Sequence, residues 1–135
     1  MVFCPGTHRF FDRPAHPLPQ LLAAGVPLGL GTDSAASNRG LSLLAEMREV
    51  RRTFPQLAPA TVFALATGSL LGSVLPGAGT LSPGGAADVA VTELGATDPD
   101  AGGKDPLGAV LDGSGETLLT VAGGRVVYRR GGAGE

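Results

Sequence analysis

Two short apolar runs, each followed by a helical pattern, constrain the fold of this chain most strongly. The first is "MVFCP" at residues 1–5, and the second is "VPLGLGTD" at residues 26–33, which carries no charge before its final Asp. Strands that are apolar on both faces are typical of a parallel sheet covered by helices. Residues 1–72 are expected to alternate strand, helix, strand, helix, helix, which is the pattern of an α/β fold.

Three segments carry helical patterns, at residues 17–25, 41–54 and 58–72. The strongest is "LSLLAEMREVRRTF" at 41–54, with Pro55 directly after it as a stop. Residues 6–16, "GTHRFFDRPAH", are expected to form a loop. The apolar face of the 41–54 helix is expected to consist of Leu41, Leu44, Met47 and Val50, and the solvated face, with local ion pairs, of Glu46, Arg48, Glu49, Arg51 and Arg52.

The pattern changes after about Leu75. A Gly- and Pro-rich approach leads to an expected strand at 88–92, and residues 95–106 are expected to form a loop. "TLLTVAGGRVVYRR" at 117–130 predicts a hairpin, because two β-rich runs flank a Gly-Gly pair suited to a tight turn. The expected strands are too few to complete a parallel sheet or a sandwich. We therefore expect this chain to be the C-terminal part of a larger protein or to need partner chains.

Composition excludes several classes of function. The formal net charge is −2 and aromatic residues make up 4% with no Trp, which disfavours nucleic-acid partners and base-stacking surfaces. No apolar run approaches the ~18 residues of a membrane helix. Cys4 is the single cysteine, and the first residues lack a signal-peptide pattern, so a cytoplasmic protein without membrane contact is expected.

Asp33 is the first candidate functional residue, because functional side chains of parallel α/β folds sit at the C-terminal ends of strands. A carboxylate there can bind a metal ion or accept a proton from water. The structural alternative is an Asx turn or a cap, with Ser34 and Asn38 as similar turn formers. The segment "GLGTDS" is no dinucleotide fingerprint, because its sixth residue is Ser34 and not Gly.

His8 follows the first expected strand and is therefore expected at the same edge of the sheet as Asp33, at the C-terminal ends of the strands. It could bind substrate, transfer a proton or ligate a metal, or simply be a polar surface residue. His16 precedes Pro17 at an expected helix start, which favours a structural role. Cys4 is expected to be a small buried residue without catalytic function.

The ordered motifs resemble a known family. "CPGTH", "LLAAGVPLGLGTDSAASNRGLSLLAEMR", "LAPATVFALATGSLLG", "GTLSPGGAADVAV" and "TVAGGRVVY" occur in this order between Val2 and Tyr128. Together they resemble the C-terminal part of the amidohydrolase superfamily, in the branch of cytosine, guanine and adenosyl-type deaminases and triazine chlorohydrolases.

The resemblance implies a fold and a division of the chain. Residues 1–75 are expected to supply strands seven and eight and the following helices of a (β/α)8 metal-dependent hydrolase barrel. Residues 76–130 are expected to supply the C-terminal share of a small β-sandwich, and residues 131–135 a flexible tail. Met1 falls inside a strand of the family pattern, which suggests a truncated reading frame or a piece of a longer gene.

The resemblance also implies chemistry. Asp33 matches the family's acid after strand eight, which binds the catalytic zinc or iron and moves a proton from the attacking water. The expected parent activity is hydrolysis of a C–N bond, by deamination of an aminated heterocycle, or dechlorination of such a ring. His8 stands where the family commonly has Asn, and Phe3 where it often has His, so His8 is expected to contact substrate instead.

The family's histidine ligands fall in barrel strands that this chain does not contain. We therefore expect the chain to be inactive alone and to need a missing N-terminal barrel segment or a homo-oligomer partner. Two rival hypotheses remain. The chain could be a non-enzymatic structural or interaction module, or the complementing half of a split enzyme.

Overall fold

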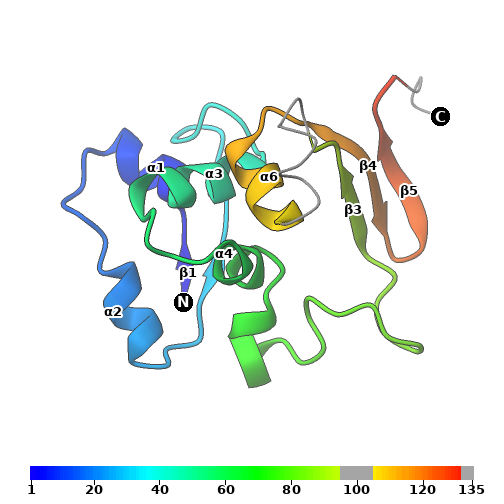
Figure 1. Ribbon diagram of the computed structural model, residues 1–135, viewed down its shortest axis with the longest axis horizontal. Helices are drawn as coiled ribbons and strands as arrows, with labels where there is room; N and C mark the ends of the chain where they lie inside the picture. The colour runs from blue at the N-terminus through cyan, green and yellow to red at the C-terminus, as the bar shows by residue number, and fades with distance from the viewer. Residues whose placement is uncertain (95–104, 132–135) are drawn as a thin grey trace. The chain divides into compact units, whose positions relative to one another are not determined.

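The computed structural model describes residues 1–94 and 105–131. The chain divides into two compact units, Met1–Gly79 and Thr80–Glu135, which we call the N-terminal and C-terminal units (Figure 1). Both helices and strands occur, so the expected mixed α/β character is confirmed. No helix among the described residues is long and apolar enough to span a membrane.

The N-terminal unit contains a two-stranded parallel sheet. Strand β1, Val2–Phe3, pairs with β2, Gly29–Leu30, as the two apolar runs predict. The pairing extends by one hydrogen bond on each side, from the Gly29 amide to the Met1 carbonyl and from the Gly31 amide to the Phe3 carbonyl, both 3.0 Å. Both strands are shorter than the apolar runs, and β1 ends early because Pro5 already begins a helix.

Helix α1, Pro5–Phe10, takes the place of the first part of the loop expected over residues 6–16, whereas residues 11–16 lie outside any helix or strand, as expected. Proline suits the first turn of a helix, because its fixed φ is helical and no amide is needed there. The Gly6 amide, which has no intrahelical partner, donates to the Glu46 carboxylate at 2.7 Å. Helix α2, Leu18–Ala23, lies within the segment predicted to be helical.

Helix α3, Leu43–Thr53, and helix α4, Pro59–Ala66, pack against each other and against β2. Ser42 caps α3 by accepting from the Ala45 amide at 3.3 Å. The expectation that α4 continues to residue 72 is wrong, because Gly68 adopts a left-handed φ of 78° and a 3-10 helix, η1, Ser69–Val74, follows.

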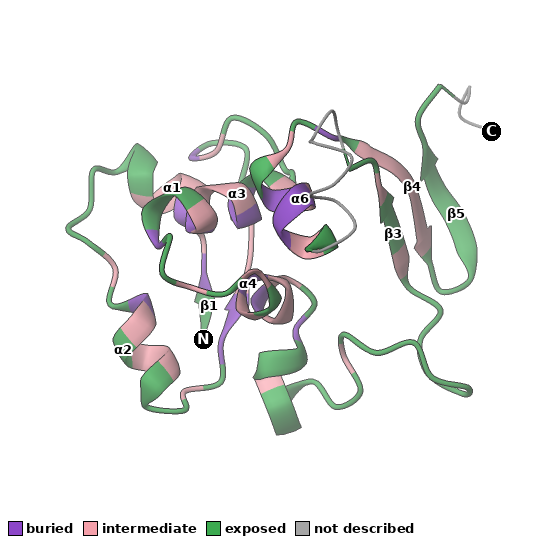
Figure 2. Ribbon diagram, viewed as in Figure 1, coloured by how far each residue is buried: buried purple, intermediate pink, exposed green. Residues whose placement is uncertain are grey.

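The expected apolar face of α3 is also partly wrong. Leu41 precedes the helix and is 64% exposed, whereas Glu46, assigned to the solvated face, is only 2% exposed. The strands and the inner sides of the helices form the buried centre of the N-terminal unit (Figure 2). Its buried apolar residues are Phe3, Leu18, Leu28, Met47, Val50, Phe54, Val62 and Leu65.

The C-terminal unit is built on an antiparallel sheet in the order β3-β4-β5. Its strands are β3, Val89–Thr92, β4, Thr117–Ala122, and β5, Arg125–Arg129. The predicted hairpin is confirmed, and its Gly123-Gly124 turn has φ values of 55° and 77°. Helix α6, Pro106–Asp112, was not predicted.

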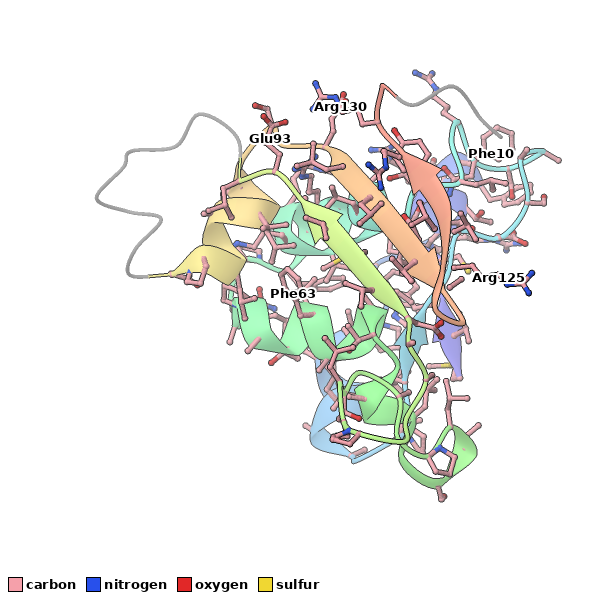
Figure 3. All side chains as sticks on the ribbon, turned by 90° about the vertical axis from the view of Figure 1, so that its right-hand side faces the viewer. Phe10, Phe63, Glu93, Arg125 and Arg130 are labelled. Atoms are coloured by element: carbon pink, nitrogen blue, oxygen red, sulfur yellow. The ribbon has the colours of Figure 1, made fainter. Side chains whose placement is uncertain are left out.

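The ion pairs of Arg130 in this unit lie at its surface. Arg130 forms an ion pair with Glu93 at 2.7 Å and lies 3.8 Å from Glu116 (Figure 3). Every residue of β5 is exposed. Most of the loop expected at 95–106, and the expected tail apart from Gly131, lie outside the described residues.

Candidate functional site

Asp33 lies three residues after β2, at the C-terminal end of the parallel strands, and its side chain is exposed. Its φ is 56°, in the left-handed region that residues other than glycine seldom adopt, although Asp tolerates it best after Asn. Such backbone outliers cluster at functional sites and persist only where surrounding contacts hold them. Asp33 therefore combines an accessible carboxylate with a constrained backbone.

A chain of hydroxyl groups orients this carboxylate. The Ser37 hydroxyl donates to Asp33 Oδ2 at 3.1 Å and lies 2.9 Å from the Thr7 hydroxyl of α1. Because a serine has one hydroxyl proton, this geometry assigns Thr7 as the donor to Ser37. The Ser37 amide also donates to the Ser34 carbonyl at 3.2 Å, so a turn spans Ser34 to Ser37 directly after Asp33. Ser37 thus joins the Asp33 side chain to this turn.

Asn38 and Glu46 hold the backbone of the same loop. Asn38 Nδ2 donates to the Thr32 carbonyl at 2.8 Å and to Glu46 Oε1 at 2.5 Å. Sequence reasoning missed Glu46, which it placed among solvated charges. A signal was present, because Glu46 stands four residues before Val50, on the buried side of α3.

His8 belongs to an aromatic cluster and not to the Asp33 network. The His16 ring stacks on Phe3 with centroids 3.9 Å apart, and the His8 ring meets each of them edge-on at 5.6 Å. Burial and the charge of His8 lower the pKa of His16. His16 Nδ1 is buried without a hydrogen-bond partner. The expected structural role of His16 is consistent with this packing.

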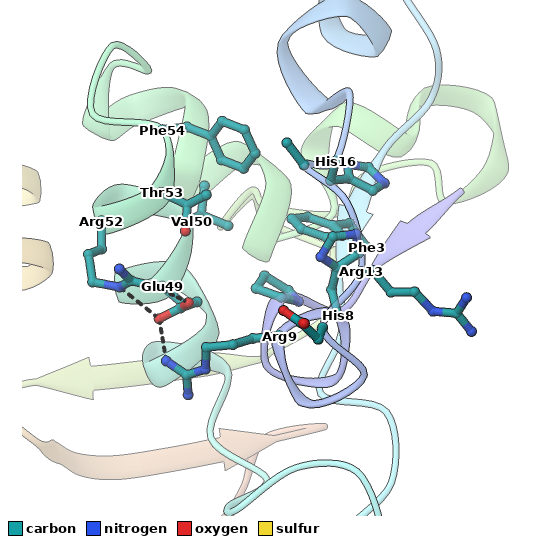
Figure 4. Close-up of a pocket in the computed structure, with 13 residues that line it drawn as sticks. Phe3, His8, Arg9, Arg13, His16, Glu49, Val50, Arg52, Thr53 and Phe54 are labelled. Atoms are coloured by element: carbon teal, nitrogen blue, oxygen red, sulfur yellow. Dashed lines mark hydrogen bonds and ion pairs between the residues drawn. The ribbon is translucent and has the colours of Figure 1, made fainter.

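A cleft of about 200 Å³ opens beside this cluster (Figure 4). Its opposite wall is α3, where Glu49 pairs with Arg52 at 2.6 Å and with Arg9 of α1 at 2.9 Å. The hydrogen bond from Arg52 is the main cause that lowers the pKa of Glu49. The predicted local ion pair on α3 is therefore present. His8 lines the cleft, whereas Asp33 does not.

Cys4 lies close to Asp33 but has the electrostatics of an unreactive thiol. Burial raises the pKa of Cys4, and the negative charges of Asp33 and Glu46 raise it further, against a small opposing effect of a hydrogen bond with the Asp33 backbone. A nucleophilic cysteine needs the opposite shift. Cys4 is half-buried, not fully buried as expected.

The donor set fits one ligand of a metal site and not a complete one. An exposed carboxylate oriented by a hydroxyl group is a suitable ligand for a divalent cation. Within residues 1–94 and 105–131, no group of three or more His, Cys, Asp or Glu side chains could hold a metal ion. A catalytic zinc site typically takes three protein ligands, so further ligands would come from polypeptide other than these residues.

Comparison with known proteins decides the family. Residues 3–127 match the model of the amidohydrolase family. The chain belongs to the amidohydrolase family. Its relatives include a 5-methylthioadenosine/S-adenosylhomocysteine deaminase of Nitratidesulfovibrio vulgaris (strain Miyazaki F), 38% identical over 126 residues, which span 87% of this chain and 29% of that protein. The corresponding deaminase of Thermococcus kodakarensis is 38% identical over 94 residues, which span 64% of this chain and 22% of that protein.

A solved structure supports the fold of this family member. E. coli guanine deaminase superposes with a TM-score of 0.72 at 24% identity, over 96% of this chain and 34% of that one. The chain therefore spans about a third or less of the proteins it matches. The resemblance inferred from the motifs is confirmed, and divalent metals are general in the family.

Proposed function

We propose that this chain supplies the Asp33 ligand and part of the substrate rim of a deaminase-type amidohydrolase. The other metal ligands come from polypeptide outside this chain. The reaction is hydrolytic deamination of an aminated heterocycle, and a thio-substituted adenosine is the first substrate to test. The observation that carries the proposal is the exposed Asp33 carboxylate, held by Ser37 at the end of a parallel strand in a family member whose relatives are deaminases.

The proposed chemistry needs little from this chain beyond one oriented carboxylate. Zinc or iron, when bound, supplies Lewis acidity that makes water nucleophilic at neutral pH. Asp33 contributes a ligand oxygen and accepts the proton that water loses as its oxygen bonds to the ring carbon. The proton that Asp33 accepts passes to the neighbouring ring nitrogen. The bond between the ring carbon and its exocyclic amino nitrogen then breaks, the hydroxyl proton goes to the amino group, which leaves as ammonia, and a ring carbonyl remains. His8 contacts the substrate ring from the cleft that it lines.

We also propose how the two units serve the whole enzyme. Residues 1–75 form strands seven and eight of a (β/α)8 barrel with their helices, and residues 76–130 complete a small β-sandwich. The parallel β1–β2 pair and the antiparallel β3-β4-β5 sheet support this assignment.

A chimeric enzyme tests the function. These 135 residues replace the matching segment of the N. vulgaris deaminase, and ammonia release from 5-methylthioadenosine is measured together with bound metal. The chimera should turn over, and Asp33→Asn should lower kcat by about 10³-fold, because the general base and one ligand are lost together. Ser34→Ala is the matched control in the same turn and should leave kcat unchanged.

Retention of wild-type turnover and metal content by the Asp33→Asn chimera would refute the role of Asp33. The 135-residue chain alone with added zinc should show no turnover on a panel of aminated heterocycles. A chimera that folds and binds metal but is inactive, together with a stable dimer of the isolated chain in size-exclusion chromatography, would favour the interaction module instead.

A further inference from the structure

Residues of α1, of the loop after β2 and of α3 meet in one hydrogen-bonded ring beside Asp33, and three pairs of adjacent residues contribute to it together with Glu46. Thr7 contacts Ser37, and Ser37 donates to Asp33 Oδ2. In parallel, Glu46 accepts from the Gly6 amide and from Asn38, and Asn38 donates to the Thr32 carbonyl. The three adjacent pairs are Gly6 and Thr7 of α1, Thr32 and Asp33 after β2, and Ser37 and Asn38 in the following turn.

Glu46 is the member of the ring that comes from α3, and both of its oxygens are engaged. Oε2 accepts from the Gly6 amide at 2.7 Å and Oε1 from Asn38 Nδ2 at 2.5 Å. The side chain is 2% exposed, and a buried carboxylate is tolerated only where hydrogen bonds replace its hydration. These bonds therefore fix Gly6 and Asn38 at the same carboxylate.

The packing at Gly6 shows how closely the segments are fitted. A Cβ atom at Gly6 would lie 2.6 Å from Glu46 Oε1 and 2.7 Å from Asn38 Nδ2. Real Cβ atoms essentially never come this close to another heavy atom, so in this arrangement only glycine permits α1, Glu46 and Asn38 to approach as they do.

We propose that Glu46 is a positioning residue that holds the Asp33 loop to helix α1 and thereby fixes the direction of the Asp33 carboxylate. It acts through Asn38 and the Thr32 carbonyl, one residue before Asp33, and it touches neither substrate nor metal. The catalytic consequence rests on the proposed function of Asp33, whereas the positioning itself does not.

The first experiment follows the ring by NMR in the 135-residue chain. Glu46→Gln keeps the shape but leaves one acceptor oxygen and introduces an NH2 donor, so either the Gly6 amide or the Asn38 side chain loses its acceptor. We expect at least one of these two groups to exchange about 10-fold faster with solvent, and the Asp33 amide resonance to shift. Unchanged Gly6, Asn38 and Asp33 resonances would overturn the proposal.

Two further variants separate positioning from general stability. Asn38→Ala should shift Asp33 while Gly6 stays protected, because the bond between Glu46 and Gly6 survives. Ser42→Ala removes the cap of α3 and should lower the melting temperature by about 3 °C, with the ring resonances unchanged. An Asp33 resonance that shifts as much in Ser42→Ala as in Glu46→Gln would mean that Glu46 only stabilises the helix, and would refute the proposal.

The second experiment uses the chimeric deaminase. Glu46→Gln should lower kcat at least about 10-fold with KM changed less than about 3-fold, because a misdirected carboxylate impairs the reaction more than binding. Ser42→Ala should leave kcat within about 2-fold. Unchanged kcat in Glu46→Gln would refute the catalytic consequence. An inactive wild-type chimera would count against the proposed function alone, and the NMR experiment would still decide the role of Glu46.

Discussion

Among the described residues, the two units of this chain differ in whether they bury polar side chains. In the N-terminal unit, Ser37 and Glu46 are 5% and 2% exposed, and their hydrogen bonds join segments up to 40 residues apart. In the C-terminal unit, the ion pair of Arg130 with Glu93 has side chains 47% and 49% exposed. Exposed pairs contribute about 0–1 kcal/mol, whereas buried polar groups are costly unless every partner is present. The stability of the N-terminal unit should therefore depend on the exact positions of these buried hydrogen-bond partners.

The largest expected difference is in the unfolding free energy lost when a valine of each unit is replaced by alanine. Val62 in α4 is fully buried, and Val127 in β5 is 62% exposed. Val62→Ala should lower the free energy of unfolding by about 2.5 kcal/mol through lost burial and a cavity. Val127→Ala should change it by less than about 0.5 kcal/mol. Urea unfolding measures both, and equal losses would show that β5 is covered in solution.

The next test concerns the close packing around the ring. Gly6→Ala should destabilise the N-terminal unit by about 2 kcal/mol, because the new methyl group overlaps Glu46 and Asn38. Gly40→Ala is the control, since no atom lies within 4 Å of its Cβ position, and it should be neutral or slightly stabilising. Similar melting temperatures for the two variants in calorimetry would contradict the close packing of Gly6 against Glu46 and Asn38.

A smaller effect is expected in the hairpin of the C-terminal unit, where local turn geometry is decisive. Gly124 has a φ of 77°, so Gly124→Ala should cost about 1 kcal/mol. Gly123→Asn should be nearly neutral, because Asn tolerates positive φ in such turns. Hydrogen exchange of the amides in β4 and β5 measures the stability of the hairpin in both variants. Unchanged exchange in Gly124→Ala would contradict the positive φ at Gly124.

The smallest effect is a pH dependence confined to the N-terminal unit, which holds both histidines of the chain. Burial and the charge of His8 lower the pKa of His16 below its ordinary 6.5. The unfolded chain therefore binds more protons, and stability should fall as the pH drops from about 6.5 through the folded pKa. His16→Phe should reduce this loss in melting scans between pH 7.5 and 5. An equal loss in the variant would exclude His16 as its source.

Local patterns predicted much of this structure. The β1–β2 pair, helices α2, α3 and α4, and the β4–β5 hairpin follow from apolar runs, helical periodicity and turn chemistry. The ordered motifs also identified the family. Helix α1 could not be predicted, because its Gly6 amide is satisfied by Glu46, which is 40 residues away in the sequence.

Taken by itself, the sequence determined the α/β character, the hairpin, the family and the position of Asp33 after a strand. Tertiary structure decided that Glu46 is buried, that Ser37 and Thr7 orient Asp33, and that His8 faces Phe3 and His16. Periodicity places a side chain on a face of its own helix, but it does not say which distant donors meet that face. For Glu46, the Gly6 amide and the Asn38 side chain made the difference between a solvated charge and a buried one.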